Sequence, residues 1–171
     1  NTDKLTWDLL CSGYTKGIFQ LESKLAQQWI KKVKPRNLWE LSAVIAIIRP
    51  GCIQSNMTAT YVENRNNPDQ QITFGHPIID DIFKTTEGIL AYQEQLMQLG
   101  MRLAWPDLPE MDRKQKTDTL RKAVGKKDQK KLLEVGKEFV EGSVKNGVPQ
   151  EIAARLFDII KDCGRYLFNL S

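Results

Sequence analysis

Apolar side chains recur every three or four residues through most of this chain, and that spacing restricts the fold more than any other feature. The clearest run spans residues 88–104, where the apolar positions are Ile89, Tyr92, Leu96, Leu99 and Leu103. A helix with such a stripe becomes stable by burying it against other helices. The sequence therefore predicts a mainly α fold, irregular and multi-helical, with at most a short β element.

Capping and helix-ending residues divide this pattern into separate helices. They are Asn37 with Glu40, Pro77, Gly125, Asp128, Gly147 and Pro149. The predicted helices cover residues 5–10, 22–33, 38–48, 78–84 and 88–104, then a basic helix that ends near Val124, and finally 129–145 and 150–163.

Three of these helices have faces that predict where they pack. In residues 22–33 the predicted buried face holds Leu25, Trp29 and Val33, and in residues 150–163 it holds Ile152, Leu156, Ile159 and Cys163. The helix at 38–48 is apolar almost all round near its C-terminal end, which predicts a central position in the core.

Two segments depart from the helical spacing. Apolar and polar residues alternate over Gly17–Leu21, which is typical of a short strand. The segment Gln54–Phe74 is rich in Asn, Gln and Thr, and it is predicted to form a long polar loop that is mobile.

Several classes of protein are disfavoured by what the sequence contains. The longest wholly apolar run, Ala43–Ile48, is far too short to cross a membrane. Cys11, Cys52 and Cys163 lie far apart without a C-x-x-C pair, so reduced thiols are expected rather than a disulfide framework or structural zinc. The only histidine, His76, stands at a predicted helix start, which favours a structural role.

The motifs of a self-sufficient active site are also missing from the sequence. It has no G-x-S-x-G element, no phosphate-binding loop and no dinucleotide fingerprint. Two-metal catalysis needs carboxylates that converge on ions about 4 Å apart. Asp80 and Asp81 are the nearest candidates, but adjacent helical residues point roughly 100° apart, so we interpret them as a solvated face. No catalytic residue and no metal ligand is predicted within this chain.

The positive charge of the chain is concentrated in one segment. The formal net charge is +4, yet residues 113–131 hold nine Lys/Arg against Asp118 and Asp128. Such a concentration suits a phosphate-bearing partner, and the alternative is a solvated helix face. Within the segment, residues 120–127 read LRKAVGKK, which places two cations on each side of Gly125 and could surround a polyphosphate.

Two further sites are notable. Arg49 follows the apolar run directly, so its guanidinium is predicted to be partly buried and to need an acidic, carbonyl or phosphate partner. Residues 92–95, YQEQ, place consecutive polar side chains on an otherwise packed helix, and they face either a ligand groove or solvent.

Five motifs together resemble the C-family replicative DNA polymerases of bacteria. Residues 17–23, GIFQLES, resemble that family's VFQLES, and residues 48–51, IRPG, are similar to its RPG. Residues 88–97, GILAYQEQLM, resemble GIxxYQEQxM, and residues 120–127 resemble LRRAMGKK. Later matches at Phe139, Gly142, residues 145–147, 157–158 and 166–169 end at an element similar to YGFNxSH. The order and approximate spacing hold over nearly all 171 residues.

The resemblance implies template-directed DNA synthesis from deoxynucleoside triphosphates in the bacterial cytoplasm, on the nucleoid. It implies that residues 1–171 are a fragment of the fingers domain, which contacts the incoming nucleotide and the primer-template. The palm, with the carboxylates that hold Mg²⁺, would precede residue 1, so the fragment alone is expected to be inactive. Other replisome subunits are expected partners of the parent enzyme, and a membrane is not.

The resemblance also assigns site residues. Arg121 and Lys122 are expected to bind the triphosphate, with Lys126 and Lys127 supporting it or the nearby DNA backbone. Arg49 and Gln93 are expected on the nucleotide or primer-terminus side. Lys122 departs from the second Arg of the family pattern and loses the forked contact, while Cys52, Leu167 and Leu170 are further departures. The alternative is a noncatalytic helical nucleic-acid-binding or scaffold protein that retains the fold.

Overall fold

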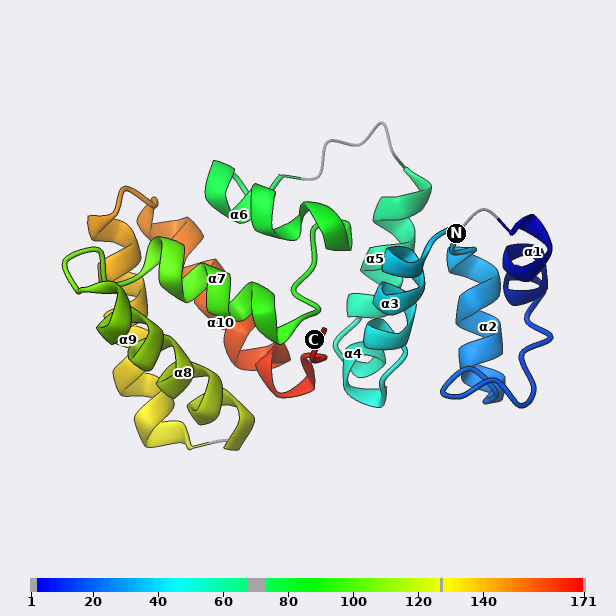
Figure 1. Cartoon of the computed structure of the whole chain (residues 1–171). Coiled ribbons are helices and arrows are strands. Elements are labelled where there is room, and N and C mark those ends of the chain that lie inside the picture. Colours follow the sequence, from blue (N-terminus) through cyan, green and yellow to red (C-terminus); the bar gives the residue numbers. More distant parts are fainter. Residues whose placement is uncertain (1–2, 68–72, 127, 171) are drawn as a thin grey trace. The chain divides into compact units, whose positions relative to one another are not determined.

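The computed structural model describes residues 3–67, 73–126 and 128–170, and in these ranges the regular secondary structure is helical apart from one isolated β-bridge (Figure 1). It forms two compact units, Asn1–Gln70 (unit 1) and Gln71–Ser171 (unit 2). Unit 1 contains α1 Lys4–Ser12, α2 Lys24–Val33, α3 Leu38–Ile47, α4 Pro50–Gln54 and α5 Met57–Asn66. Unit 2 contains α6 Pro77–Phe83, α7 Gln93–Leu103, α8 Glu110–Lys126, α9 Gln129–Lys145 and α10 Gln150–Cys163, with 3-10 turns at Lys84–Thr86 and Gly164–Tyr166. The prediction of a mainly α fold is confirmed.

Side-chain caps fix the starts of the first three helices in unit 1. The side chains of Asp3, Ser23 and Asn37 each accept a hydrogen bond from a backbone N–H in the first turn of the helix that follows. At the other end of α1, Gly13 has a φ of 75°, and a Cβ there would lie 2.3 Å from Cε of Lys31. The left-handed φ makes glycine the favoured residue here, whereas the flexible lysine side chain could move aside for a Cβ.

The predicted strand at Gly17–Leu21 is wrong, because the described residues form turns there. Among the described residues no strand pairs with this segment, and the hydroxyl of Thr15 instead donates to the carbonyl of Leu21 and closes the loop. Leu21 is buried, whereas Phe19 is 84% exposed.

The predicted buried face of α2 is only partly right, because Val33 is buried as expected but Leu25 and Trp29 are not. Ala26, Ile30 and Val33 are buried, whereas Leu25 is exposed and Trp29 is only partly covered. The helix begins at Lys24, two residues later than predicted, because Ser23 caps it.

The predicted loop at Gln54–Phe74 is wrong over most of its length, because residues 57–66 form α5. This helix has little apolar surface, but Met57, Thr58 and Tyr61 bury one side of it. The hydroxyl of Thr58 donates to the carbonyl of Ile47 at 2.6 Å, which joins α5 to the end of α3. Residues 68–72 of the predicted loop lie outside the described ranges. The central position predicted for α3 is confirmed, since its last turns are buried nearly all round.

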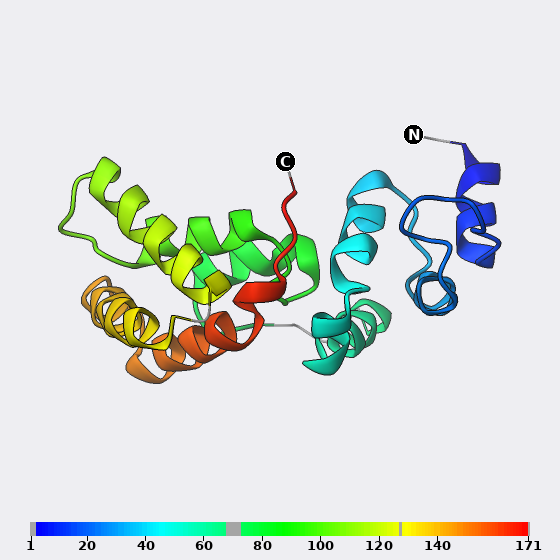
Figure 2. The ribbon, with the colours of Figure 1, turned by 90° about the horizontal axis from the view of Figure 1, so that it is seen from below.

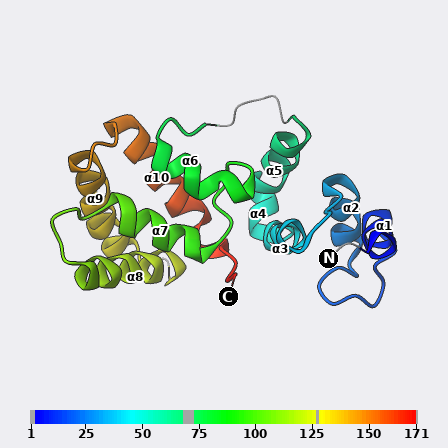
Figure 3. The same cartoon turned by 45° about the horizontal axis from the view of Figure 1, so that its top comes forward.

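Unit 2 is organised around one apolar core. Its buried members include Leu96, Leu99, Leu120, Phe139 and Leu156, drawn from α7 to α10. Helices α7 and α8 lie side by side and are joined by the loop at 104–109 (Figure 3). Caps and turn residues give α9 and α10 the bounds that the sequence predicts, with Gly147 at a φ of 92° between them.

In α10 the predicted stripe is only partly right. Leu156 and Cys163 are buried as expected, but Ala153 and Ile160 complete the buried face. Ile152 and Ile159 flank it and are partly covered.

The starts and ends of α7 and α8 differ from the prediction. The chain is extended before Gln93, because Tyr92 and Phe168 form an isolated parallel bridge, which is the short β element of the described residues. The C-terminal segment therefore runs beside the segment that precedes α7 (Figure 2). Gly125 does not end α8, which continues through Lys126, and a Cβ at Gly125 would meet nothing within 4 Å.

Candidate functional site

The basic segment places two cations around one carboxylate on α8. The guanidinium of Arg121 donates from Nη2 at 2.7 Å and from Nε at 3.0 Å to Oδ1 of Asp118. The ammonium of Lys122 lies 2.6 Å from Oδ2 of the same carboxylate. These hydrogen bonds, from Lys122 first and then Arg121, lower the pKa of Asp118 below its ordinary value. The side chains of Arg121 and Asp118 are each 34% exposed, so the cluster is open to solvent.

The remaining cations of the segment divide into those with structural partners and those that face solvent. Arg113 donates to the carbonyl of Met101 at 3.2 Å, and Lys116 lies 2.6 Å from the carboxylate of Glu138. By contrast, the structure gives no ion pair to the exposed side chains of Lys114, Lys126, Lys130 and Lys131 among the described residues. Lys127, which the sequence assigned to the same site, lies outside the described ranges.

Gln93 occupies the first position of α7, where it holds the C-terminal segment. Its backbone N–H donates to the carbonyl of Phe168 at 2.9 Å, and its side-chain amide donates to the carbonyl of Leu167 at 3.4 Å. The carboxylate of Glu94 accepts from the backbone N–H of Leu170. Two of the quoted motifs, far apart in sequence, are therefore bonded to each other, a partnership that sequence spacing does not reveal.

Gln95 is buried, which neither interpretation of the YQEQ motif predicts. Its carbonyl oxygen accepts from the backbone N–H of Ala91 and of Tyr92, at 2.9 and 3.0 Å. Its amide nitrogen donates to the carbonyl of Ile82 and to the hydroxyl of Thr86. Gln95 thus fixes the extended segment that leads into α7.

Antiparallel packing brings Gln93 and Arg121 to the same end of the α7–α8 pair. Gly100 faces Thr117 across the pair, and Arg113 reaches the carbonyl of Met101. The C-terminal half of α8 therefore runs beside the N-terminal half of α7. Both of these predicted site residues lie in unit 2.

Arg49 belongs to unit 1, where it is the residue before the first turn of α4. Its side chain is partly buried, as predicted. The neighbouring thiol of Cys52 is buried, which raises its pKa, and the positive charge of Arg49 opposes that rise.

Asp80 and Asp81, the acidic pair considered above as metal ligands, make contacts within the fold instead. Asp80 accepts hydrogen bonds from Thr73 and Phe74 in the turn before α6, and Asp81 pairs with Arg102 at 2.6 Å. Within the described ranges, no three His, Cys, Asp or Glu side chains come together as metal ligands. The same ranges contain no helix that is long and apolar enough to cross a membrane.

The described residues thus form two mainly α units, and in the second of them Arg121 and Lys122 of α8 gather around one carboxylate. The family model described as the bacterial DNA polymerase III alpha subunit finger domain matches residues 1–147. The chain belongs to this family, so the family inferred from the motifs is confirmed.

Relatives match over almost the whole chain. It is 34% identical to the DNA polymerase III subunit alpha of Aquifex aeolicus over 169 residues, and 35% identical to that of Pseudomonas aeruginosa over 174 residues. The subunit of Escherichia coli is 31% identical over 173 residues. Each match covers 99% of this chain but only 14% of the relative. The chain therefore spans about one-seventh of the length of these proteins.

Proposed function

We propose that residues 1–171 form a fingers segment of a DNA-directed DNA polymerase, which binds the incoming deoxynucleoside triphosphate and the primer-template. The family membership supports the class of enzyme. The segment 148–171, beyond the family match, is included because α10 packs into the core of unit 2 with α9.

The observation that carries the site assignment is the way Arg121 and Lys122 converge on the Asp118 carboxylate. A forked guanidinium and an ammonium already hold the two oxygens of one anion at 2.6 to 3.0 Å. Phosphate oxygens present the same chemistry with more charge, so a triphosphate can replace the carboxylate as their partner. Asp118 would then be the internal partner that a triphosphate displaces from Arg121 and Lys122.

Charge neutralisation is the chemical contribution of this site. Phosphoryl transfer needs cations on the triphosphate oxygens in addition to metal ions. Arg121 and Lys122 would supply it, with Lys126 and Lys127 supporting the triphosphate or the adjacent DNA backbone. The carboxylates that hold Mg²⁺ would come from another part of the full-length polymerase, since the described residues offer no such cluster.

Arg49 and Gln93 would act on the nucleotide or primer-terminus side. For Gln93 the support is its place at the Arg121 end of the α7–α8 pair. Because its amide already binds the carbonyl of Leu167, Gln93 would act by positioning the 167–170 segment.

The decisive test is Arg121→Ala in the full-length polymerase. A charge-assisted contact contributes about 1.5–3 kcal/mol, so kcat/KM for the nucleotide should fall roughly tenfold to more than a hundredfold. Stability should change by no more than about 0.5 kcal/mol, because only a surface ion pair within α8 is lost. Single-turnover incorporation over a nucleotide titration, beside thermal unfolding, separates the two effects.

The matched control is Arg102→Ala, which also removes an arginine from a surface ion pair in unit 2. It should incorporate nucleotide normally. If Arg121→Ala behaves like this control, or merely unfolds, the basic segment is a solvated face and the assignment is wrong.

Substitutions at Lys122 should give smaller effects. Lys122→Ala should reduce incorporation less than Arg121→Ala does, because an ammonium makes a point contact. Lys122→Arg should be neutral or mildly improved in the same assay. A larger loss for Lys122→Ala than for Arg121→Ala would reverse the proposed roles.

A further inference from the structure

The most concentrated positive charge of unit 1 lies at the corner between α2 and α3. Residues 31–36, KKVKPR, hold four cations and no acidic residue. Residues 1–70 as a whole contain nine Lys/Arg and six Asp/Glu, so this corner alone outweighs their net charge of +3. The corner belongs to unit 1, whereas the α8 segment belongs to unit 2.

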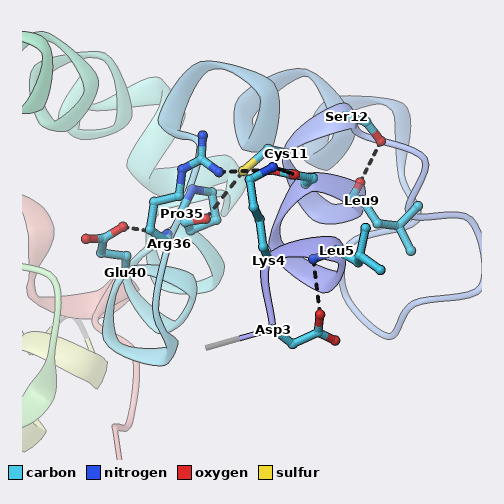
Figure 4. Close-up of polar contacts among 10 residues, drawn as sticks. Asp3, Lys4, Leu5, Leu9, Cys11, Ser12, Pro35, Arg36 and Glu40 are labelled. Carbon is cyan, nitrogen blue, oxygen red and sulfur yellow. Dashed lines mark hydrogen bonds and ion pairs between the residues drawn. The ribbon is translucent and has the colours of Figure 1, made fainter. Parts of the chain in front are cut away.

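The backbone of this corner is held in place from two sides. Arg65 on α5 donates to the carbonyl of Val33 at 3.0 Å, and its guanidinium lies 2.6 Å from the carboxylate of Glu40. Glu40 also accepts from the backbone N–H of Arg36 at 2.7 Å, and the thiol of Cys11 donates to the carbonyl of Pro35 (Figure 4). The cations therefore project from a fixed loop, so less conformational freedom is lost when they bind a ligand.

The lysines of the corner are available to a ligand. Lys31, Lys32 and Lys34 are exposed, and the structure gives none of them an ion pair among the described residues. Arg36 lies 3.1 Å from Asp8, but both side chains are well exposed, and such a surface pair is easily exchanged for another anion.

Two tryptophans belong to the helices that meet at this corner, Trp29 on α2 and Trp39 on α3. The ammonium of Lys32 lies 4.5 Å from the ring centroid of Trp29 on α2. Trp39, in the first turn of α3, is 74% exposed although it is among the largest apolar side chains in the unit. Trp39 follows Arg36 by three residues, so the corner combines an exposed indole, which can stack on a base, with exposed cations, which can contact phosphates.

We propose that the α2–α3 corner binds single-stranded DNA, with Trp39 stacking on an unpaired base and Lys31, Lys32 and Lys34 contacting the backbone. A single strand is favoured over a duplex because bases in a duplex are already stacked on one another and leave no face for the indole. This site is distinct from the Arg121–Lys122 pair and does not depend on nucleotide binding there.

Binding of a labelled oligothymidylate of about 16 nucleotides to the 171-residue chain tests the stacking part. Trp39→Ala should weaken binding roughly fivefold to more than a hundredfold, while Trp39→Phe retains most of the affinity. The control is Met111→Ala, which removes an equally exposed apolar side chain from α8 and should bind like the unaltered chain. If Trp39→Ala binds as well as Met111→Ala, stacking at the corner is refuted.

The charge part is tested by the triple variant Lys31→Gln, Lys32→Gln, Lys34→Gln. The slope of log affinity against log salt should decrease by about 2, since each single-strand phosphate contact contributes about 0.7. The matched control, Lys16→Gln, Lys24→Gln, Lys84→Gln, removes the same charge from exposed lysines that lie outside both the corner and the basic segment 113–131.

Two results would overturn the proposal. One is a control triple that weakens oligothymidylate binding as much as the corner triple does, because the effect would then follow net charge alone. The other is a duplex of equal length that binds as tightly as the single strand and is equally sensitive to Trp39→Ala. Far-UV circular dichroism of each variant excludes misfolding, and incorporation by the Arg121→Ala polymerase reports separately on the α8 site.

Discussion

The two units of the chain hold themselves together by different means. Unit 2 has a continuous apolar core to which every one of its α-helices contributes. Unit 1 has shorter helices, and its α5 is largely polar, so the contacts of Arg65 with Val33 and Glu40 take over part of the role of apolar burial. The comparison shows that a largely polar helix can be integral to a fold when one of its side chains joins the ends of two other helices.

The largest expected effect lies in unit 2 at Gln95, a buried side chain that makes four hydrogen bonds. Gln95→Leu would leave the buried N–H groups of Ala91 and Tyr92 without their partner, so the free energy of unfolding should fall by about 4 kcal/mol. The control is Gln98→Leu on the exposed side of the same helix, which should change stability by less than about 0.5 kcal/mol. Urea unfolding measures both free energies. If the two variants lost equal stability, the hydrogen bonds of Gln95 would contribute nothing to the stability of unit 2.

A second effect concerns how closely the helices of unit 2 pack. In Gly100→Ala the new Cβ would lie 2.4 Å from the side chain of Thr117, which is β-branched, fully buried and unable to move aside. We expect a loss of about 2–3 kcal/mol. Gly125→Ala, in open space on α8, should instead gain about 0.5–1 kcal/mol. If urea unfolding showed no loss of stability for Gly100→Ala, α7 and α8 would be able to move apart at little cost.

The corresponding test in unit 1 is Arg65→Ala. Its ion pair with Glu40 is about 20% exposed and its Nε also bonds the end of α2, so we expect a loss of about 2 kcal/mol. Arg65→Lys should recover only part of this, because lysine cannot make both contacts in a fork. Hydrogen exchange should show lost protection in α2, α3 and α5 and unchanged protection in α7–α10. Protection lost equally in both units would contradict the idea that Arg65 stabilises unit 1 alone.

The sequence predicts the helix ends that local residues determine, and it does not predict those that depend on distant contacts. Helices α9 and α10 were predicted with correct bounds because Asp128, Gly147 and Pro149 mark their ends locally. The start of α7 was not predictable, since it depends on the Gln95 side chain and on the bridge from Tyr92 to Phe168, 76 positions later. Helix α5 was missed because its decisive contacts are tertiary and its apolar face is small.

The candidate site was predictable in the same uneven way. Arg121 and Lys122 are neighbours on one helix, and Asp118 at spacings of three and four residues could have been recognised as their shared partner. The contact of Gln93 with Leu167 could not, because no local pattern links positions so distant. The exposure of Trp39, and the partial exposure of Trp29 that was predicted to be buried, could not be foreseen, because they depend on which face of each helix the fold buries.

The smallest expected effect is the pH-dependent contribution of Asp118. Lys122 and Arg121 lower its pKa in the folded chain, so its charged form stabilises the fold above the ordinary pKa of about 3.9, and this contribution is lost as the pH falls through the lowered value. Asp118→Asn should therefore be less stable than the unaltered chain at pH 7, by at most about 1 kcal/mol because the cluster is open to solvent. The difference should shrink below pH ~4 and in about 1 M salt, where exposed charges are screened. Urea unfolding of the two proteins over this pH range measures it. A difference that persists unchanged at low pH would show that Asp118 stabilises α8 by its shape rather than by its charge, and that its carboxylate is not the internal partner of Arg121 and Lys122.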